Sequence, residues 1–360
     1  MAAYTTINDS ESFFQAVIYT GNGSADNSIT LPGTTDMQQD MVWIKNREQA
    51  DNHCLFDSVR GVTELQYVNS NASDITDADT LDAFQSDGFR VDADVKVNTN
   101  TEDYVAWCWK AGTTSGITTT NANTTPDTYS FSQTAGISII QFDGNGTDDT
   151  QVAHGLGAVP HLYITKNMDA DDDGGISWTV YHHKNTDAPE TDKLHLDEIY
   201  ATADSNTRWS DQAPDANNMT LGTSSQVNSS SRDYIGYVFS EKQGFSKFNR
   251  FTGNGDVDGP FCFCGFKPAF IIIKKSSATG PWIMFDNKRP FQTSDFEKPR
   301  LVANATGTDS SSFLGLDFLA NGFKLRETDS DINGSGVTYH FIAFAEATFV
   351  NSNGVPCNAR

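Results

Sequence analysis

Short apolar runs recur along the whole chain, and clusters of Gly, Asn, Asp and Ser separate them. The clearest runs are rich in β-branched and aromatic residues: LYITK at 162–166, YIGYVF at 234–239, FIIIK at 270–274 and YHFIAFAEA at 339–347. This composition and punctuation predict strands joined by turns. Helical patterns are confined to a short capped helix from Asp9 or Ser10 and one turn at 79–84. The pattern therefore predicts an all-β protein with few helices.

The motif aromatic-x-Gly-Asn-Gly occurs three times, at Tyr19–Gly23, Phe142–Gly146 and Phe251–Gly255. Counted from the Asn of each motif (Asn22, Asn145, Asn254), a lysine follows after 23, 21 and 20 residues (Lys45, Lys166, Lys274) and a tyrosine after 82, 89 and 85 residues (Tyr104, Tyr234, Tyr339). Landmarks kept in order at nearly constant offsets indicate three homologous units of roughly a hundred residues each.

A unit of this length with several short strands can bury its apolar faces by stacking one sheet on another. We therefore expect three tandem β-sandwich domains, jelly-roll-like and arranged in a row. The expected boundaries are an N-terminal anchoring segment at 1–18, repeat 1 at 19–112, a Thr/Asn-rich linker at 113–136, repeat 2 at 137–248 and repeat 3 at 249–360.

Charge narrows the classes of partner. The 360 residues include 47 acidic and 24 basic ones, a formal net charge of -23, which opposes phosphate backbones and anionic membranes. The sequence contains no long apolar run, and its start lacks the pattern of a secretory signal. We expect a protein made in a cytoplasm, with no nucleic acid partner and no membrane insertion.

Residues with catalytic potential form no recognisable signature. The five cysteines are unevenly spaced and are expected to be mostly reduced. His182 and His183 have no nucleophile motif beside them, and the carboxylates are too evenly spread to single out an acid and base pair. Asn-Gly favours positive φ, so the repeated motif is interpreted as a turn rather than a ligand loop. The expectation is no catalytic residue, no cofactor and no enzyme activity.

Calcium is the one metal that the sequence keeps as a candidate. Three acidic loops, starting at Asp169, Asp329 and Asn254, supply alternating oxygen ligands, and the candidates are Asp169, Asp171, Asp173, Asp329, Asp331 and Asn333. An EF-hand also needs a glutamate at its twelfth position, where the three loops have Val180, His340 and Gly265. An acidic, solvated turn is therefore the favoured interpretation.

Trp107 and Trp109 stand at i and i+2, which places both on one face of a strand. An exposed pair of this kind could stack on sugar rings, and we keep the two as glycan-stacking candidates. Paired strand aromatics are more often part of a core, and that interpretation is favoured.

The first unit, through TDMQQDMVWIKNR, HCLFDSVRG, SDGFRV and VNTNTEDYVAWCWKAG, resembles a repeat domain of structural proteins of marine bacteriophages such as cyanophages. The second and third units resemble it more weakly, through GNG, IIIKK and YHFIAFAE. The resemblance implies a virion component and carries no activity over to particular residues.

The expected function is a non-enzymatic virion structural protein, most simply a tail fibre or fibre-like appendage for host attachment. The alternatives are a capsid-decorating protein or head fibre, and a carbohydrate-binding adhesin; a glycan depolymerase is disfavoured. Expected partners are other virion proteins, further copies of the chain (a trimer by analogy) and a host surface glycan. Tail or capsid location and receptor identity are not encoded in any pattern found.

Overall fold

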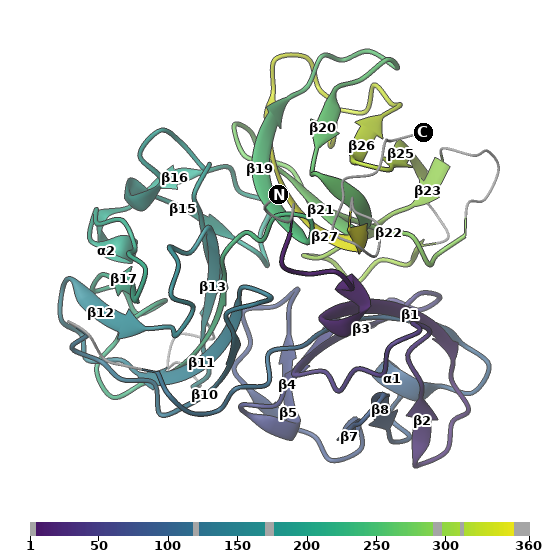
Figure 1. The fold of residues 1–360 in the computed structure, drawn as a ribbon, viewed down its shortest axis with the longest axis horizontal. Coiled ribbons are helices and arrows are strands. Elements are labelled where there is room, and N and C mark those ends of the chain that lie inside the picture. The colour runs from purple at the N-terminus through teal and green to yellow at the C-terminus, as the bar shows by residue number, and fades with distance from the viewer. Residues whose placement is uncertain (1–4, 118–121, 170–175, 291–296, 310–312, 349–360) are drawn as a thin grey trace.

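The computed structural model describes residues 5–117, 122–169, 176–290, 297–309 and 313–348. The fold is all-β, as predicted, and the strands of the described residues form six sheets. Each repeat contributes one large sheet and one smaller sheet, which appear as three groups around a common centre in Figure 1. The sandwiches were expected to stand in a row, and the observed arrangement is a closed ring instead.

In the first unit the large sheet has the order β1 (Phe14–Thr20), β9 (Asp103–Trp109), β3 (Met41–Asn46), β4 (Cys54–Asp57), β5 (Gly61–Tyr67) and β6 (Ile75–Thr76). The smaller sheet has the order β2 (Asn27–Ile29), β8 (Gly88–Val91) and β7 (Leu81–Gln85). A short helix, α1 (Val95–Asn98), precedes β9, and a 3-10 turn, η1 (Ser10–Ser12), precedes β1.

In the second unit the large sheet has the order β10 (Thr128–Ser132), β11 (Ile137–Asp143), β18 (Asp233–Phe239), β13 (Leu162–Asn167), β14 (Thr179–His182), β15 (Asp192–His195) and β16 (Ala203–Asp204). The smaller sheet pairs β12 (Thr150–Ala153) with β17 (Asn218–Leu221). The remaining elements are η2 (Pro189–Thr191) and α2 (Asn206–Trp209).

In the third unit the large sheet has the order β19 (Ser246–Thr252), β27 (Thr338–Thr348), β21 (Phe266–Lys275), β22 (Trp282–Asp286) and β24 (Leu301–Val302). The smaller sheet has the order β20 (Phe261–Phe263), β26 (Gly322–Leu325), β25 (Phe313–Leu319) and β23 (Glu297–Pro299). The motif strand, the tyrosine strand and the lysine strand are adjacent in the same order in all three large sheets, which agrees with duplication of one unit.

Several local expectations need correction. The pattern at 9–19 forms only the turn η1, which Asp9 caps by accepting a hydrogen bond from the Glu11 N–H, and the chain then enters β1. Residues 14–18 of the expected anchoring segment thus belong to the first sheet. The segment 79–84 enters strand β7 because its apolar side chains pack between the two sheets. The expected linker contains β10, which pairs with β11.

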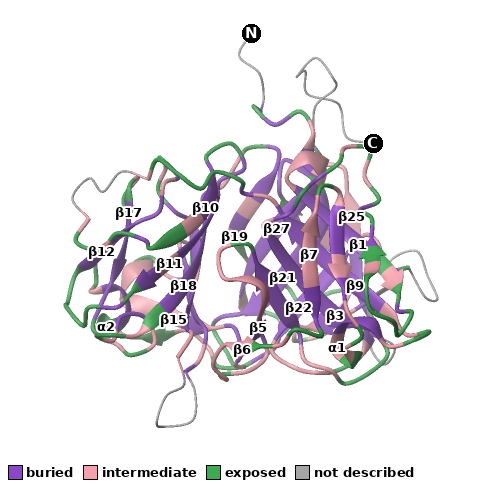
Figure 2. Cartoon of the chain, turned by 90° about the horizontal axis from the view of Figure 1, so that it is seen from below, coloured by how far each residue is buried: buried purple, intermediate pink, exposed green. Residues whose placement is uncertain are grey.

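The three large sheets meet in one apolar core. Phe14 of the first unit stacks on Phe344 of the third with ring centroids 5.5 Å apart, and Phe239 of the second unit lies 5.9 Å from the same ring. Figure 2 shows the buried residues concentrated on the large-sheet strands that face this centre. Because apolar burial contributes about 25 cal/mol per Å², this shared cluster stabilises the contact between the three units.

The ring closes through one hydrogen bond that recurs at each interface between units. The acceptor is the carbonyl two residues after the landmark lysine, and the donor is a backbone N–H of the preceding unit in the ring: Asp74 to Met168 (2.9 Å), Thr202 to Ser276 (2.9 Å) and Asp309 to Arg47 (3.1 Å). We call these the first, second and third interfaces. Head-to-tail contacts of this kind close into a ring when the rotation between units permits it.

Candidate functional site

The repeated turn motif docks onto the loop that precedes the closing tyrosine. The motif's second glycine has φ of +65°, +70° and +68° at Gly23, Gly146 and Gly255, so the expected positive φ is present at each copy. At Gly21 an added Cβ would lie 2.2 Å from the carbonyl oxygen of Thr99, and a similar approach occurs in the other units. The glycines are therefore required by a turn and by close backbone packing.

A buried asparagine ties each of these turns in place, and sequence analysis missed it. The Asn98 Nδ2 donates to Asn22 Oδ1 (3.1 Å), the Ser24 carbonyl (2.8 Å) and the Asp92 carbonyl (2.9 Å), while its Oδ1 accepts from the Asn22 N–H. Asn228 and Asn333 make the corresponding bonds. Each lies six residues before the landmark tyrosine, a constant spacing that the sequence displays.

The landmark tyrosine explains the aromatic residue of the motif. Tyr19 stacks on Tyr104 with centroids 5.1 Å apart, and the pairs Phe142–Tyr234 (5.5 Å) and Phe251–Tyr339 (5.1 Å) repeat the contact. The Tyr104 hydroxyl donates to the Val95 carbonyl at 2.7 Å and accepts from the Thr99 N–H at 2.8 Å. The motif is thus committed to internal packing.

The landmark lysines are buried, and two of them cross to the neighbouring unit. Lys166 Nζ donates to the Asn71 carbonyl (2.8 Å) of the first unit, and Lys274 Nζ donates to the Ile199 carbonyl (3.1 Å) of the second. Burial lowers the pKa of Lys166 to about 8 and that of Lys274 to about 7. Since their donors are spent on carbonyls, these lysines hold the ring rather than present a nucleophile.

The glycan-stacking candidates lie in the common core. Trp107 is 0% and Trp109 is 3% exposed, and both rings contact Phe270 of the third unit at centroid distances of 5.2 and 5.7 Å. A buried indole cannot reach a sugar, so the core interpretation replaces the stacking one. The period-2 spacing placed the two on one face correctly, but that face is covered by another repeat.

The acidic-loop candidates are mostly committed to other contacts. Asn333 is the buried tie of the third unit, Asp329 Oδ1 accepts from the Asp331 N–H (2.7 Å), and Asp331 pairs with Lys275 and Arg300. Asp169 Oδ2 accepts from the Asp233 N–H at 2.8 Å.

Asp171 and Asp173 lie outside the described residues. Within the described part of the chain, no group of three or more His, Cys, Asp or Glu side chains could hold a metal ion. Calcium binding therefore gains no support from the loops whose side chains are placed, and the sequence expectation of no cofactor stays a prediction.

The first and third interfaces each contain a buried ion pair three residues apart. Arg60 Nε lies 2.6 Å from Asp57 Oδ2, and Arg289 Nε lies 2.7 Å from Asp286 Oδ2. Burial opposes the charge on Arg60, but Asp57 outweighs it and the arginine pKa is raised. Arg60 also pairs with Asp74 of the same unit (2.8 Å), and its Nη2 lies 3.4 Å from the Tyr237 hydroxyl of the second unit. These arginines fill the space between adjacent units.

The second unit breaks this pattern, and a cavity of about 620 Å³ lies at its interface with the third unit. Where the first and third units have the Asp and Arg of the ion pair, the second unit has His182 and Asn185. Two residues after its landmark lysine the third unit has Ser276, whereas the second unit has Met168 and the first has Arg47. The equivalent cleft at the first interface, lined by Arg60, measures about 330 Å³. We call these two hollows the second cleft and the first cleft.

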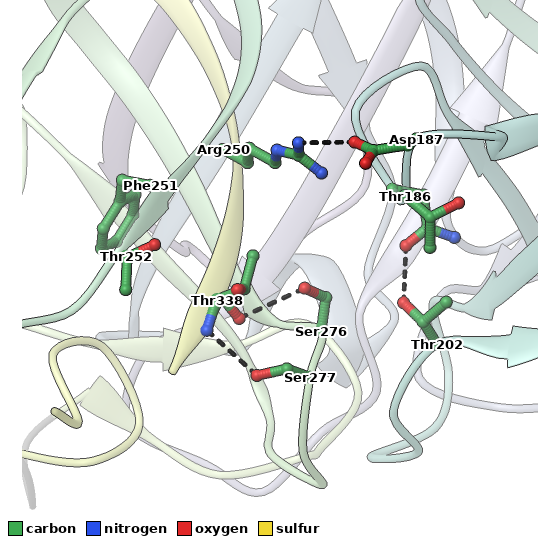
Figure 3. A pocket seen from close by; sticks show the side chains of 10 residues that line it. Thr186, Asp187, Thr202, Arg250, Phe251, Thr252, Ser276, Ser277 and Thr338 are labelled. Carbon is green, nitrogen blue, oxygen red and sulfur yellow. Dashed lines mark hydrogen bonds and ion pairs between the residues drawn. The ribbon is translucent and has the colours of Figure 1, made fainter. Parts of the chain in front are cut away.

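Hydroxyl and amide side chains line the second cleft. They are Asn185, Thr186, Thr202, Thr252, Ser276, Ser277 and Thr338, joined by Phe251, Asp187 and Arg250. Figure 3 shows Thr186, Asp187 and Thr202 of the second unit facing Arg250, Thr252 and Thr338 of the third. Arg250 Nη2 and Asp187 Oδ1 are 2.9 Å apart across the mouth. The cleft is therefore polar and electrically balanced.

Four histidines lie near the second interface, outside the residues that line its cleft. His182 stacks on His340 with centroids 4.7 Å apart, and His161 lies 4.5 Å from His183. Burial lowers the pKa of His340 and of His183 to about 4. They are thus neutral at pH 7, and no serine or cysteine among the described residues forms a triad with them.

The described cysteines lack the lowered pKa of a reactive thiol. Cys54, Cys108, Cys262 and Cys264 are free and buried, and burial raises the pKa of each thiol.

In the described part of the chain no helix is both long enough and apolar enough to cross a membrane.

Comparison with known proteins assigns the chain to a family without assigning an activity. Residues 9–348 match the family described as "Domain of unknown function (DUF7483)", and the chain belongs to it. No curated protein and no solved structure matches the chain.

Proposed function

We propose that this member of the family is a non-enzymatic structural protein of a bacteriophage virion, made in the host cytoplasm and used in host attachment, most simply as a tail fibre or fibre-like appendage. The observation that supports it best is the fate of the repeated landmarks. The lysine, tyrosine, asparagine and glycine of each unit all serve internal contacts, as expected of a scaffold. The resemblance of the first unit to phage structural repeats supplies the setting.

The finer description of the fold belongs to the same proposal. We interpret each large sheet with its smaller partner as one jelly-roll-like sandwich, and the three as tandem copies. The shared strand order of the large sheets supports this. An experimental structure in which a repeat had lost the two-layer arrangement would contradict it.

Association of several copies, a trimer by analogy, is also proposed. Each chain contains three repeats around one centre, so a trimer would place nine repeats around its symmetry axis. Light scattering on the purified chain measures this directly. A monomer at all concentrations would remove the homo-oligomer from the proposal.

The direct test of the virion assignment is mass spectrometry of purified particles from the phage that encodes the chain. We expect the polypeptide at copy numbers that are multiples of three or six, as for a tail appendage. Its absence from particles would overturn the assignment, while a copy number tied to the icosahedral lattice would move it to the capsid.

A carbohydrate-binding adhesin is the second candidate function, and the second cleft is the observation that favours it. The buried tryptophans no longer support it, but an open polar cavity of about 620 Å³ does. Cavities of about 300–1,000 Å³ are typical of small-molecule sites. Virions that lose adsorption when only this cleft is filled would favour the adhesin over a purely structural part.

A further inference from the structure

We propose that the second cleft binds a neutral saccharide of a few sugar residues. The proposal rests on the proposed role in host attachment only for the source of that saccharide, a host surface glycan. The binding itself is argued from the cleft.

Divergence between the repeats created the cavity. At the first interface Arg60 and Met168 line the cleft, and at the third interface Arg47 and Arg289 both approach Asp309, at 2.7 and 3.8 Å. The second interface has Asn185 and Ser276 at these places, the two shortest side chains of the set. Both positions became smaller in the same interface, which leaves room for a ligand.

Asn185 is buried at the base of the second cleft and keeps bonding capacity there. Its side chain is 4% exposed, and its Oδ1 accepts from Thr202 Oγ1 at 2.5 Å. Its Nδ2 has no partner among the described residues. An unpaired buried donor is costly. Because this Nδ2 is inaccessible to solvent, the Asn185 side chain must rotate before a ligand in the cleft can pair with it.

The rim offers further donors and acceptors. The Ser277 hydroxyl oxygen accepts from the Thr338 N–H at 3.0 Å, which leaves its O–H free to donate. Among the described residues the Thr252 and Thr338 hydroxyls have no partner, and Arg250 spends only Nη2 on Asp187. Hydroxyls that both donate and accept suit a ligand built of hydroxyls, because each sugar O–H also does both.

Charge argues for a neutral sugar. Among the described residues that line the cleft, Arg250 and Asp187 are the only charged ones, and they pair with each other. The chain as a whole carries a net charge of -23, which repels anionic glycans at distances up to the Debye length of about 8 Å in physiological salt. A guanidinium and a carboxylate side by side can still bond to adjacent hydroxyls of an uncharged ring.

The test uses the full chain and saturation-transfer NMR, followed by calorimetry. The probes are glucose, galactose, mannose, N-acetylglucosamine and their common disaccharides, with glucuronate as the anionic comparison. We expect at least one neutral probe to bind and glucuronate to bind more weakly. Binding of glucuronate alone, or of none of the probes, would overturn the proposal.

Two kinds of variant locate the site. H182D/N185R restores the Asp-x-x-Arg pair of the other units and should abolish binding by filling the cleft, while S276M fills it with the side chain that the first interface carries at this position. Arg250→Ala should weaken binding about tenfold, equivalent to about 1.4 kcal/mol, through the loss of charge-assisted hydrogen bonding. Arg90→Ala is the matched control, because the exposed fraction of the Arg90 side chain (35%) is close to that of Arg250 (40%). Arg90 pairs with Asp26 and Asp82 of the first unit, which contributes none of the described residues that line the second cleft.

Each outcome decides one question. If every folded cleft-filling variant keeps the affinity of the unaltered chain, the sugar binds elsewhere and the proposal is wrong. Folding is checked by the melting curve, and S276M serves if H182D/N185R does not fold. Absence of the polypeptide from virions would end the proposed function without changing the binding result, so the two failures are distinguishable.

Discussion

The first and second clefts occupy equivalent places in the repeat, yet an arginine narrows the first to about 330 Å³ while the second measures about 620 Å³. In the first cleft Arg60 is bonded to Asp57 and to Asp74, both of its own unit. In the second cleft His182 and Asn185 stand at the equivalent positions, and the cavity is about twice as large. The difference shows that the repeats share a scaffold and that function is to be sought where one repeat departs from it.

The largest expected effect comes from breaking the arginine pair. Arg60→Ala leaves Asp57 buried without its partner, which should lower the free energy of unfolding by about 3–5 kcal/mol. Asn185→Ala removes one hydrogen bond from an already open site and should cost only about 1 kcal/mol. Urea denaturation of both variants measures the contrast. Equal losses would show that the two clefts do not differ as described.

The asparagine ties should respond alike in all three units. Asn98→Ala, Asn228→Ala and Asn333→Ala each leave buried carbonyl groups unpaired, and we expect losses of about 2–3 kcal/mol in every case. Asn217 is exposed and serves as the control, with an expected change within about 0.5 kcal/mol. A loss confined to one unit would contradict a scaffold common to the repeats.

Sequence patterns predicted the strands because β-branched runs between Gly and Asn clusters depend on local chemistry. They also gave the repeat, since Lys45, Lys166 and Lys274 keep their offsets from the motif. The ring was missed because a strand such as β9 shows that two tryptophans share a face, but not which surface covers that face. The turn at 79–84 was misread because tertiary pairing of β7 with β8 overrides local helix preference.

The candidate site escaped prediction for a related reason. The equivalent segments FDSVRG (56–61), YHHKNT (181–186) and FDNKRP (285–290) differ visibly in the sequence. That difference indicates a cavity only once it is known that each segment lies where two units meet. Thr202 and Ser276 lie far apart in the chain and come together only because the ring closes.

Acid should affect the two clefts in opposite directions. Burial holds the pKa of His340 and His183 at about 4, below the value of about 6.5 in an unfolded chain, so stability at the second cleft is lost as pH falls from about 6.5 to 4. Burial raises the pKa of Asp74 and Asp233 to about 6, so the first cleft gains stability over the lower part of that range.

Melting temperatures of the unaltered chain and of Asp74→Asn between pH 7 and 5 measure this balance. Without the Asp74 carboxyl the melting temperature should fall more steeply on acidification. The same slope in both proteins would show that the first cleft contributes no opposing effect.

The most direct measurement of the account is a crystal structure of the chain soaked with the best neutral saccharide of the panel. We predict sugar density in the second cleft, bonded to Ser277, Arg250 and a rotated Asn185 amide, and no sugar in the first cleft, which Arg60 narrows. Density in the first cleft, or an empty second cleft at a saccharide concentration well above the Kd, would contradict the account.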